Sequence, residues 1–327
     1  MPCYLGLDLG GTGIKTAVVD DQGRVLSKSS APTPGDRGPD AVMDQMVKLG
    51  AAVVSEAGLA MGQIDAVGIG APGQIDFEQG VLASAPNLPL LTKVPVRDRI
   101  AQATGRPTVL ENDANAAAFG EYWAGAGRDP SIRHLVVLTL GTGVGGGVIL
   151  DGQIVHGGFG NGGEAGHMIM VADGPLCGCG QHGCLEVYAS ASYVARRAIE
   201  AIQAGQRSVL DQIHQADGKS VTAKDVFEAA KAGDALAGRV AGEAATFLGL
   251  ACVSLCRLLD PQMIVMAGGM IQAGDYLLER VREAFVSHDW KMAERAVEIA
   301  PAQLGPDAGV IGSAAVACDA HEKGRLA

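Results

Sequence analysis

Two segments of the chain share one pattern of strands and turns. Residues 4–26 read YLGLDLGGTGIKTAVVDDQGRVL, and residues 134–155 read HLVVLTLGTGVGGGVILDGQIV. In each, an apolar strand leads through a glycine- and threonine-rich turn into a second apolar strand, and an Asp- and Gly-containing turn leads into a third. A pattern used twice in matching register predicts two lobes of like topology that face one cleft. Such turns can be plain hairpins, but the matching register favours turns whose backbone N–H groups approach phosphate oxygens.

Helical and strand patterns alternate between and after these segments. With 327 residues, 48% of them apolar, the chain can bury a large core and is long enough for two domains. Buried strands are predicted over residues 64–69, 108–110 and 263–266. Apolar spacing predicts a helix opened by Asn112 or Asp113 as N-cap, and others over residues 40–57, 94–104, 191–204, 223–232, 235–259, 275–287 and 314–323. The alternation indicates an α/β protein with a mainly parallel sheet in each lobe.

Composition and charge exclude several classes of protein. The net charge of −11 argues against a nucleic-acid surface, which needs clustered Lys and Arg. No apolar run reaches the ~20 residues of a membrane span, and the N-terminal MPCYLGLDLGG lacks the basic and apolar regions of a signal peptide. Four of the seven cysteines stand apart and are typical of reduced thiols: Cys3, Cys252, Cys256 and Cys318. We therefore expect a cytoplasmic protein with no nucleic-acid and no membrane partner.

Four potential metal ligands fall within eighteen residues, HMIMVADGPLCGCGQHGC, with the spacing H-x9-C-x-C-x4-C. One imidazole and three thiolates complete a tetrahedral shell with no open position, which is typical of a structural Zn²⁺ site. Glycines between the thiols allow the tight turns that such a knuckle requires. Free thiols in a loop are the alternative, and a disulfide fits a cytoplasmic chain less well. The predicted zinc ligands are His167, Cys177, Cys179 and Cys184.

Eight motifs together resemble those of the ROK sugar kinases, in the family's order and over nearly the whole chain. The resemblance implies the actin/hexokinase-like (ribonuclease H-like) fold: two lobes with duplicated β-sheets, hinged around a cleft that holds ATP and a sugar. It places residues 1–115 plus 312–327 in a small N-terminal lobe and residues 116–311 in a large lobe. The motifs are DLGGTGIK (8–15), GAPGQID (70–76), NLP (87–89), ENDANAAAFGE (111–121), LGTGVGGGVI (140–149), EAGH (164–167), CGCGQHGCLE (177–186) and DAGVIGSA (307–314).

Asp113 is the predicted catalytic residue. A hydroxyl that attacks the γ-phosphoryl group of ATP needs a carboxylate directed at its proton. Asp113 lies at a strand-to-helix junction, where a carboxylate is held rigidly. From the residues alone, an ordinary N-cap role is an equal alternative; the resemblance implies that Asp113 is the general base.

The resemblance also implies which residues bind the nucleotide. Asp8 helps to hold Mg²⁺ and the phosphates of ATP, while two glycine turns approach the phosphate oxygens. Lys15 is either a phosphate contact or a solvated charge at the edge of a strand. A later glycine pair approaches the adenosine or forms a packing turn. The predicted residues are Asp8, Gly10, Gly11, Thr12 and Lys15, then Gly141, Thr142 and Gly143, and finally Gly268 and Gly269.

Selection of a sugar needs donors and acceptors around its hydroxyl groups, because an unpaired buried polar group is costly. The resemblance assigns this role to Asn87, Asn112, Asp113, Glu164, His167 and Glu186. His167 would bind zinc through one nitrogen and the sugar through the other, so the metal would fix the orientation of the ring. The same knuckle would position Glu186. Three other histidines, His134, His156 and His182, are interpreted as surface or turn residues.

These assignments predict ATP-dependent phosphorylation of a hexose, with glucose as the preferred substrate. The alternatives are an N-acetylhexosamine kinase (N-acetylglucosamine or N-acetylmannosamine), a fructokinase, and a sugar-sensing ROK regulator without a DNA-binding domain. Because the first glycine turn begins at Asp8, we expect no winged helix before it, which favours the enzyme. The acidic chain argues against a basic groove for polyphosphate as donor. Family habit and the apolar composition suggest a homodimer or higher homo-oligomer.

Overall fold

The computed structural model describes residues 1–215, 220–289 and 296–326, which fall into two compact units. Unit 1 comprises Met1–Ile132, Gly147–Gly163 and Gln303–Ala327, and unit 2 comprises Arg133–Gly146 and Glu164–Ala302. The sequence instead suggested boundaries after residues 115 and 311. Unit 1 extends beyond residue 115 because the helix that follows packs against the C-terminal helix of the same unit.

The sheet of unit 1 has the strand order β3-β2-β1-β4-β7. Short turns join β1 to β2 and β2 to β3, so these pairs are antiparallel, whereas β1 with β4 and β4 with β7 are parallel. The prediction of a mainly parallel sheet is therefore wrong for this unit, because its own glycine turn demands antiparallel neighbours. The strands are β1 (Cys3–Leu9), β2 (Gly13–Asp20), β3 (Val25–Pro32), β4 (Ala66–Ala71) and β7 (Thr108–Asn112).

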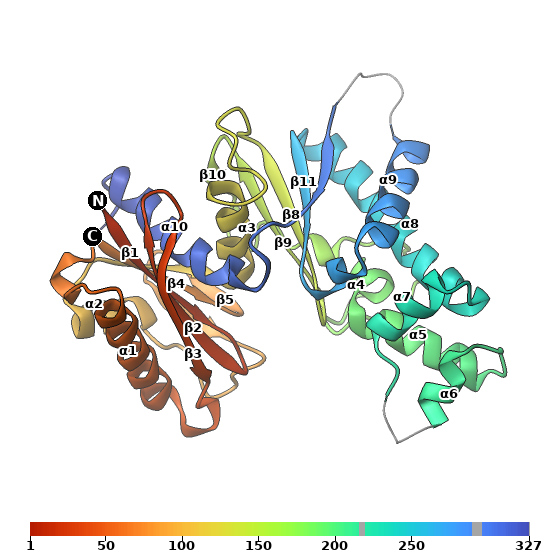
Figure 1. Cartoon of the computed structure of the whole chain (residues 1–327), viewed down its shortest axis with the longest axis horizontal. Helices are drawn as coiled ribbons and strands as arrows, with labels where there is room; N and C mark the ends of the chain where they lie inside the picture. Colours follow the sequence, from red (N-terminus) through yellow and green to blue (C-terminus); the bar gives the residue numbers. More distant parts are fainter. Residues whose placement is uncertain (216–219, 290–295, 327) are drawn as a thin grey trace. The chain divides into compact units, whose positions relative to one another are not determined.

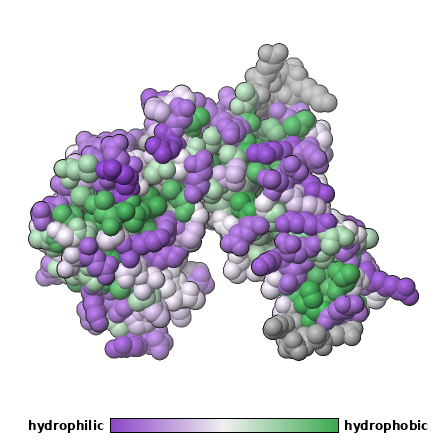
Figure 2. Space-filling model, viewed as in Figure 1, coloured by the Kyte–Doolittle hydropathy of each residue, from purple (hydrophilic) through white to green (hydrophobic). Residues whose placement is uncertain are grey.

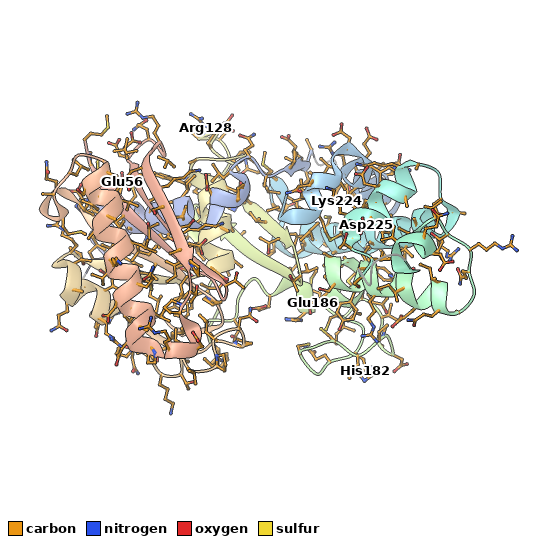
Figure 3. All side chains as sticks on the ribbon, turned by 60° about the horizontal axis from the view of Figure 1, so that its bottom comes forward. Glu56, Arg128, His182, Glu186, Lys224 and Asp225 are labelled. Carbon is orange, nitrogen blue, oxygen red and sulfur yellow. The ribbon has the colours of Figure 1, made fainter. Side chains whose placement is uncertain are left out.

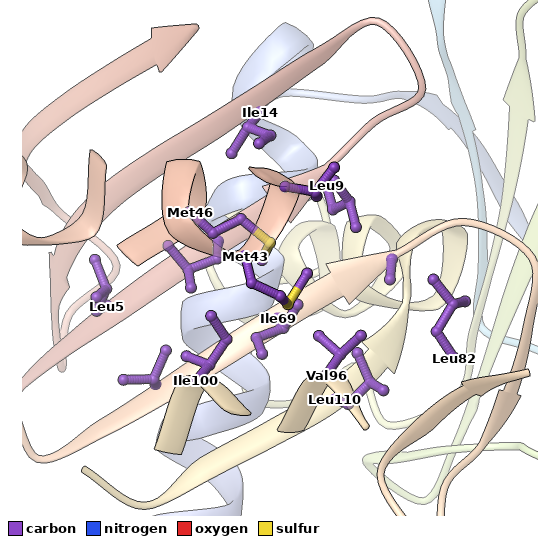
Figure 4. Close-up of a cluster of buried hydrophobic side chains, with 14 of the residues drawn as sticks. Leu5, Leu9, Ile14, Met43, Met46, Ile69, Leu82, Val96, Ile100 and Leu110 are labelled. Carbon is purple, nitrogen blue, oxygen red and sulfur yellow. The ribbon is translucent and has the colours of Figure 1, made fainter. Parts of the chain in front are cut away.

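Alternate residues of β1 face different layers of unit 1. Its three leucines join a buried cluster under α1 (Pro39–Glu56) and α2 (Val96–Thr104), as Figure 4 shows. Tyr4 and Gly6, which alternate with them, face α10 (Ala308–Glu322) on the other side of the sheet. Each fully buried leucine contributes about 1.5–3 kcal/mol relative to an exposed one. This two-sided burial fixes the end of β1, where the first glycine turn begins.

Glycines let α10 approach both the sheet and α3 (Asp113–Trp123). A Cβ atom on Gly68 of β4 would lie 1.7 Å from the carbonyl oxygen of Ser313. One on Gly312 of α10 would lie 1.7 Å from the carbonyl oxygen of Ala116. No larger residue fits at either position without a backbone shift. The C-terminal helix is therefore packed back onto the strands and the helix that carry the predicted catalytic residues of unit 1.

The second sheet has the order β10-β9-β8-β11-β12, which matches the first sheet position by position. The strands from the second repeated segment, β8, β9 and β10, correspond to β1, β2 and β3. β8 pairs with β11, and β11 with β12, in parallel, while β9 pairs with β10 antiparallel. The predicted internal repeat is confirmed. The strands are β8 (Leu135–Leu140), β9 (Val144–Leu150), β10 (Gln153–Ile154), β11 (Met263–Ala267) and β12 (Glu298–Pro301).

Helices make up most of the rest of unit 2 (Figure 1). By length and composition alone, the central helix α8 could cross a membrane, and 50% of its most apolar window is buried. It packs against α5, α7 and α9, as the core helix of a folded unit does. The helices are α4 (Glu186–Ala189), α5 (Ala191–Gln203), α6 (Leu210–Gln215), α7 (Ala223–Lys231), α8 (Ala235–Leu259) and α9 (Asp275–His288). On the face in Figure 2, hydrophilic side chains are interspersed with smaller hydrophobic groups.

Most predicted helices begin and end within two residues of the observed ones. The last helix begins at Ala308, before the predicted start at residue 314. Gly309 and Gly312 lower the helical propensity of its first turns, which is why the sequence pattern did not predict them. Three features were not predicted from the sequence: α6, β12 and a hairpin of two short strands, β5 (Gln74–Asp76) and β6 (Val81–Ser84). That hairpin leads directly to the loop that carries Asn87.

Candidate active site

The first glycine turn joins β1 to β2 in unit 1. The N–H group of Gly10 donates to a carbonyl three residues later (2.9 Å), and the hydroxyl of Thr33 donates to the carbonyl of Gly10 (2.7 Å). Thr12 is exposed at the tip of the turn. A Cβ atom on Gly11 would lie 2.9 Å from the Cβ of Asn87. The structure thus brings the first predicted phosphate turn against the predicted sugar residue Asn87.

Asp8 lies at the end of β1, opposite Lys15 in the strand register. A Cβ atom on Gly309 would lie 2.6 Å from Oδ2 of Asp8, so the carboxylate faces the first turn of α10. Burial raises the pKa of Asp8 to about 6; the charge of Lys15 opposes this shift, and that of Asp113 adds to it. The ammonium of Lys15 donates to the carbonyl of Pro306 (2.6 Å). Asp8 and Asp113 therefore lie close enough to interact.

Asn112, and not Asp113, is the N-cap of α3. Its Oδ1 accepts the N–H groups of Ala114 (3.0 Å) and Asn115 (3.2 Å), and its Nδ2 donates to the carbonyl of Gly73 (3.3 Å). Asp113 is the first helical residue, and its Oδ1 accepts the N–H group of Ala114 (2.8 Å). The capping role that competed with catalysis thus belongs to the neighbouring residue. The amide of Asn112, predicted to contact sugar, is already bonded to protein at both ends.

His156 lies outside the helices and strands with its side chain 37% exposed, which agrees with the interpretation as a surface or turn residue, but its ring also has a specific buried partner. Its Nε2 lies 2.7 Å from Oε2 of Glu111, whose side chain is only 3% exposed. The ring also packs against that of Phe77, with centroids 4.2 Å apart. The hydrogen bond with Glu111 raises the pKa of His156, although burial opposes the shift. No role was predicted for Glu111, although a charged residue inside a short buried strand is a signal for one.

The second glycine turn, between β8 and β9 in unit 2, resembles the first. The N–H group of Gly141 donates to a carbonyl two residues later (3.0 Å), and Thr142 is exposed at the tip. Gly268, with a φ of 90°, packs against the end of β8: a Cβ atom there would lie 2.5 Å from the carbonyl oxygen of Leu140. A Cβ atom on Gly269 would meet nothing within 4 Å. Gly268 is therefore a packing turn that borders the second glycine turn, and Gly269 borders open space.

The four predicted zinc ligands come together in unit 2, and their ligand atoms all lie within 4.8 Å of one another. Sγ of Cys177 is 3.8 Å from Nδ1 of His167, and Sγ of Cys179 is 3.7 Å from Sγ of Cys184. Tetrahedral Zn–S bonds of ~2.3 Å and Zn–N bonds of ~2.1 Å would separate ligand atoms by roughly 3.6–3.8 Å. The donor set and its spacing fit a closed tetrahedral metal site.

The protonation of these thiols depends on their surroundings. Burial raises the pKa of Cys177 to about 12 and also raises the pKa of Cys184, whereas a hydrogen bond from the backbone of Gln181 lowers that of Cys179. A bound divalent cation would have to displace protons from the two buried thiols. None of the seven cysteines forms a disulfide in the structure.

Glu186 connects the metal-ligand cluster to the second glycine turn. Its Oε2 accepts the N–H group of Val144 (3.0 Å), and its Oε1 lies 3.4 Å from Sγ of Cys177. A Cβ atom on Gly143 would lie 2.4 Å from Oε2 of Glu186, so a larger residue there would displace this carboxylate. Figure 3 places Glu186 at the base of the loop that carries the exposed His182. The sugar prediction and the phosphate prediction for unit 2 thus converge on one carboxylate.

The EAGH segment lies against the same turn. A Cβ atom on Gly166 would lie 1.8 Å from the carbonyl oxygen of Val144. His167 directs Nδ1 toward Cys177, so Nε2 lies at the opposite edge of the ring. Glu164 is exposed at the start of this segment. Of the six predicted sugar residues, unit 1 holds Asn87, Asn112 and Asp113, and unit 2 holds Glu164, His167 and Glu186.

Two α/β units with matching sheet orders, each with a glycine turn after its first strand, define a two-lobed protein of duplicated topology. The chain belongs to the ROK family, whose match covers residues 4–320.

Similar proteins carry related names. A glucokinase from Halalkalibacterium halodurans is 37% identical over 310 residues, covering 94% of this chain and 93% of the relative. The solved structure of a ROK hexokinase from Thermus thermophilus has a TM-score of 0.82 at 36% identity and covers 98% of this chain and 99% of its own. A ROK glucokinase from Streptomyces griseus, solved with glucose and AMPPNP, has a TM-score of 0.78 at 35% identity and covers 97% and 99%. These structures confirm the predicted two-lobe actin/hexokinase-like fold.

Proposed function

We propose that this protein is an ATP-dependent hexokinase that converts glucose to glucose 6-phosphate. The observation that carries the proposal is the position of Asp113. It occupies the first turn of α3 without serving as its cap, and it interacts with Asp8 beside the first glycine turn. A ROK relative named glucokinase, 37% identical over most of the chain, supports glucose as the acceptor.

In the proposed reaction, Asp113 accepts the proton of the sugar 6-hydroxyl as that oxygen bonds to the γ-phosphorus of ATP. The bond from the γ-phosphorus to the bridging oxygen breaks, and ADP leaves with the electron pair. The start of α3 holds the carboxylate rigidly. Backbone N–H groups around Gly11 and Gly141 would orient the phosphates.

Asp8 is the residue that fits Mg²⁺ in unit 1. A buried carboxylate with a raised pKa, close to a second carboxylate, gains from a neighbouring cation. When bound with ATP, Mg²⁺ would neutralise negative charge on the phosphates. Lys15, which opposes the pKa shift of Asp8, would act through Asp8 and not as a direct phosphate contact.

We propose a structural Zn²⁺ ion held by His167, Cys177, Cys179 and Cys184. With four protein ligands it would offer no open position, so its contribution would be to hold the knuckle together. Nδ1 of His167 faces the cluster, which would leave Nε2 to contact a sugar hydroxyl. Glu186 would be held by the N–H group of Val144, since Cys177 loses the proton that it donates to Oε1 of Glu186 when it binds the metal.

A panel of initial rates with ATP, Mg²⁺ and six sugars tests the substrate: glucose, mannose, fructose, allose, N-acetylglucosamine and N-acetylmannosamine. We expect glucose to give the highest kcat/KM. A higher kcat/KM for an N-acetylated sugar would show that the protein is an N-acetylhexosamine kinase and not a glucokinase. No turnover with any sugar would contradict the kinase itself and favour a sugar-sensing protein.

The Asp113→Asn variant tests the general base. We expect it to fold and bind glucose while kcat falls by about two to four orders of magnitude, the range for the loss of a positioned acid–base group. Glucose binding is checked by calorimetry. Turnover of the variant near the wild-type rate would contradict the assignment of Asp113 as the general base.

A further inference from the structure

We infer that His156 and Glu111 form an ion pair that positions Asp113 for catalysis. The inference rests on the proposed kinase function, because it assigns a supporting role for the same reaction. Neither residue is among the predicted sugar or nucleotide ligands, so both are positioning residues. The first observation is the burial of Glu111: a carboxylate that is 3% exposed is costly unless donors surround it.

Three donors from different parts of unit 1 surround that carboxylate. Its Oε1 accepts the N–H group of Asn112 (2.9 Å) and the Nδ2 group of Asn115 (3.1 Å). Its Oε2 pairs with Nε2 of His156 (2.7 Å). Asn112 and Asn115 bracket Asp113, so Glu111 ties both ends of the segment that carries the predicted base. The N–H groups of Ala114 and Asn115 also donate to Oδ1 of Asn112, so the N-cap bonds hold the same segment in place.

His156 is held on a different part of the chain. It follows β10, which the bond from the N–H group of Val155 to the carbonyl of Val148 (2.9 Å) extends along β9. Its own carbonyl accepts the N–H group of Gly162 (2.8 Å), which closes the glycine-rich segment that leads to Glu164. The ion pair therefore joins this segment to the start of α3.

The pairing also depends on charge. The hydrogen bond with Glu111 raises the pKa of His156 and so favours the charged imidazolium, although burial and Arg325 oppose the shift. Arg325 is the other charge that acts on His156, and it opposes protonation. Its guanidinium is itself engaged by Asp319 and by Oε1 of Gln153 (3.2 Å). As pH rises through the raised pKa, His156 loses its charge and Glu111 loses its only cationic partner among the described residues.

The geometry suggests two variants of His156 with different consequences. His156→Phe keeps a ring against Phe77 but removes the donor to Glu111. His156→Gln keeps a neutral N–H donor and removes the titratable charge. We expect His156→Phe to lower kcat by about 10- to 100-fold, because small displacements of a catalytic group have effects of this size. The KM for ATP should stay within about twofold of wild type. At neutral pH, His156→Gln should lower kcat to the level that wild type reaches on the alkaline side, because neither side chain then carries a charge.

A matched control distinguishes positioning from ordinary stability. Glu121 on α3 is also fully buried and accepts three backbone N–H groups, from Ala126, Gln303 and Leu304, at 2.8–3.0 Å. It lies two turns beyond Asp113. Glu111→Gln should lower kcat at temperatures where the variant is fully folded, whereas Glu121→Gln should lower Tm and leave kcat unchanged.

The pH profile supplies a readout that a merely structural role would not move. Wild-type kcat should decline on the alkaline side, where His156 loses its proton, and His156→Gln should abolish that decline. If wild type is active and His156→Phe has the same kcat, the positioning role of His156 is wrong, while the proposed kinase function stands. A wild type without hexokinase activity would overturn the proposed function, and the inference would fall with it.

Discussion

At the scale of single residues, Asp8 shows the tension between stability and function. Burial raises its pKa from 3.8 to about 6. Between those values the unfolded chain loses the proton before the folded protein does. The free energy of unfolding should therefore fall as pH rises from about 4 to 6, by an amount on the order of 3 kcal/mol at 1.36 kcal/mol per pKa unit. The fold tolerates this cost at a position where a cation would relieve it.

Asp8→Asn should therefore stabilise the protein while inactivating it. Without nucleotide and Mg²⁺, we expect the variant to have a higher Tm than wild type at pH 7.5 and a similar Tm near pH 4. Its kcat should fall by about 100-fold or more, since the proposed Mg²⁺ ligand is gone. Asp44→Asn, at an exposed position of α1, is the control and should change neither property. If the Tm of wild type and the Tm of Asp8→Asn change with pH in parallel, this account is contradicted.

At the scale of secondary-structure elements, close packing between α10 and β4 should dominate local stability. Gly68→Ala would force a Cβ atom to within 1.7 Å of the Ser313 carbonyl oxygen, so the helix must shift. We expect a loss of about 1–3 kcal/mol or more in urea unfolding, as for other overpacked cores. Because Gly309 of α10 faces Asp8, kcat should fall as well. Gly62→Ala, with no atom within 4 Å of the new Cβ, is the control and should be nearly neutral.

The metal-ligand knuckle makes a second prediction at this scale. Cys179→Ala should reduce zinc to well below one ion per chain, because three ligands rarely hold a structural site. The KM for glucose should rise more than the KM for ATP, since His167 and Glu186 lose their support together. Cys256→Ala, at a buried thiol of α8 outside the cluster, should keep its zinc. Wild type that contains no zinc by metal analysis and keeps full activity after chelation would exclude this role.

Much of the fold was predictable at this scale, and the limits have physical causes. Strand periodicity and the two glycine turns revealed the internal repeat, and the ligand spacing revealed the metal cluster. The direction of strand pairing was mispredicted because helices and strands alternate in mixed sheets as well as in parallel ones. The pair between Glu111 and His156 was invisible because its partners are 45 residues apart and meet only through tertiary packing. The early start of α10 was missed because its glycines serve packing and not helix propensity.

At the scale of the whole molecule, the predicted ligand residues divide between the two units. The chain passes between the units after Ile132, Gly146, Gly163 and Ala302, which are not the crossovers that the predicted boundaries implied. Each unit has its own sheet and its own glycine turn, so each can hold its part of the binding residues independently. Whether the six predicted sugar residues serve one sugar is therefore a question for the protein in solution.

Hydrogen exchange with saturating glucose answers that question. If all six residues bind one sugar, glucose should slow amide exchange in residues 85–115 of unit 1 and in residues 164–186 of unit 2 at the same ligand concentration, because one binding event then orders both. A nonhydrolysable ATP analogue with Mg²⁺ should instead protect residues 8–15, 141–144 and 268–269. The Asp113→Asn variant should keep the glucose pattern, since it retains a side chain that can bond the hydroxyl. Protection confined to one unit would show that the other three residues do not bind the sugar, and the assignment of that unit's residues would have to be withdrawn.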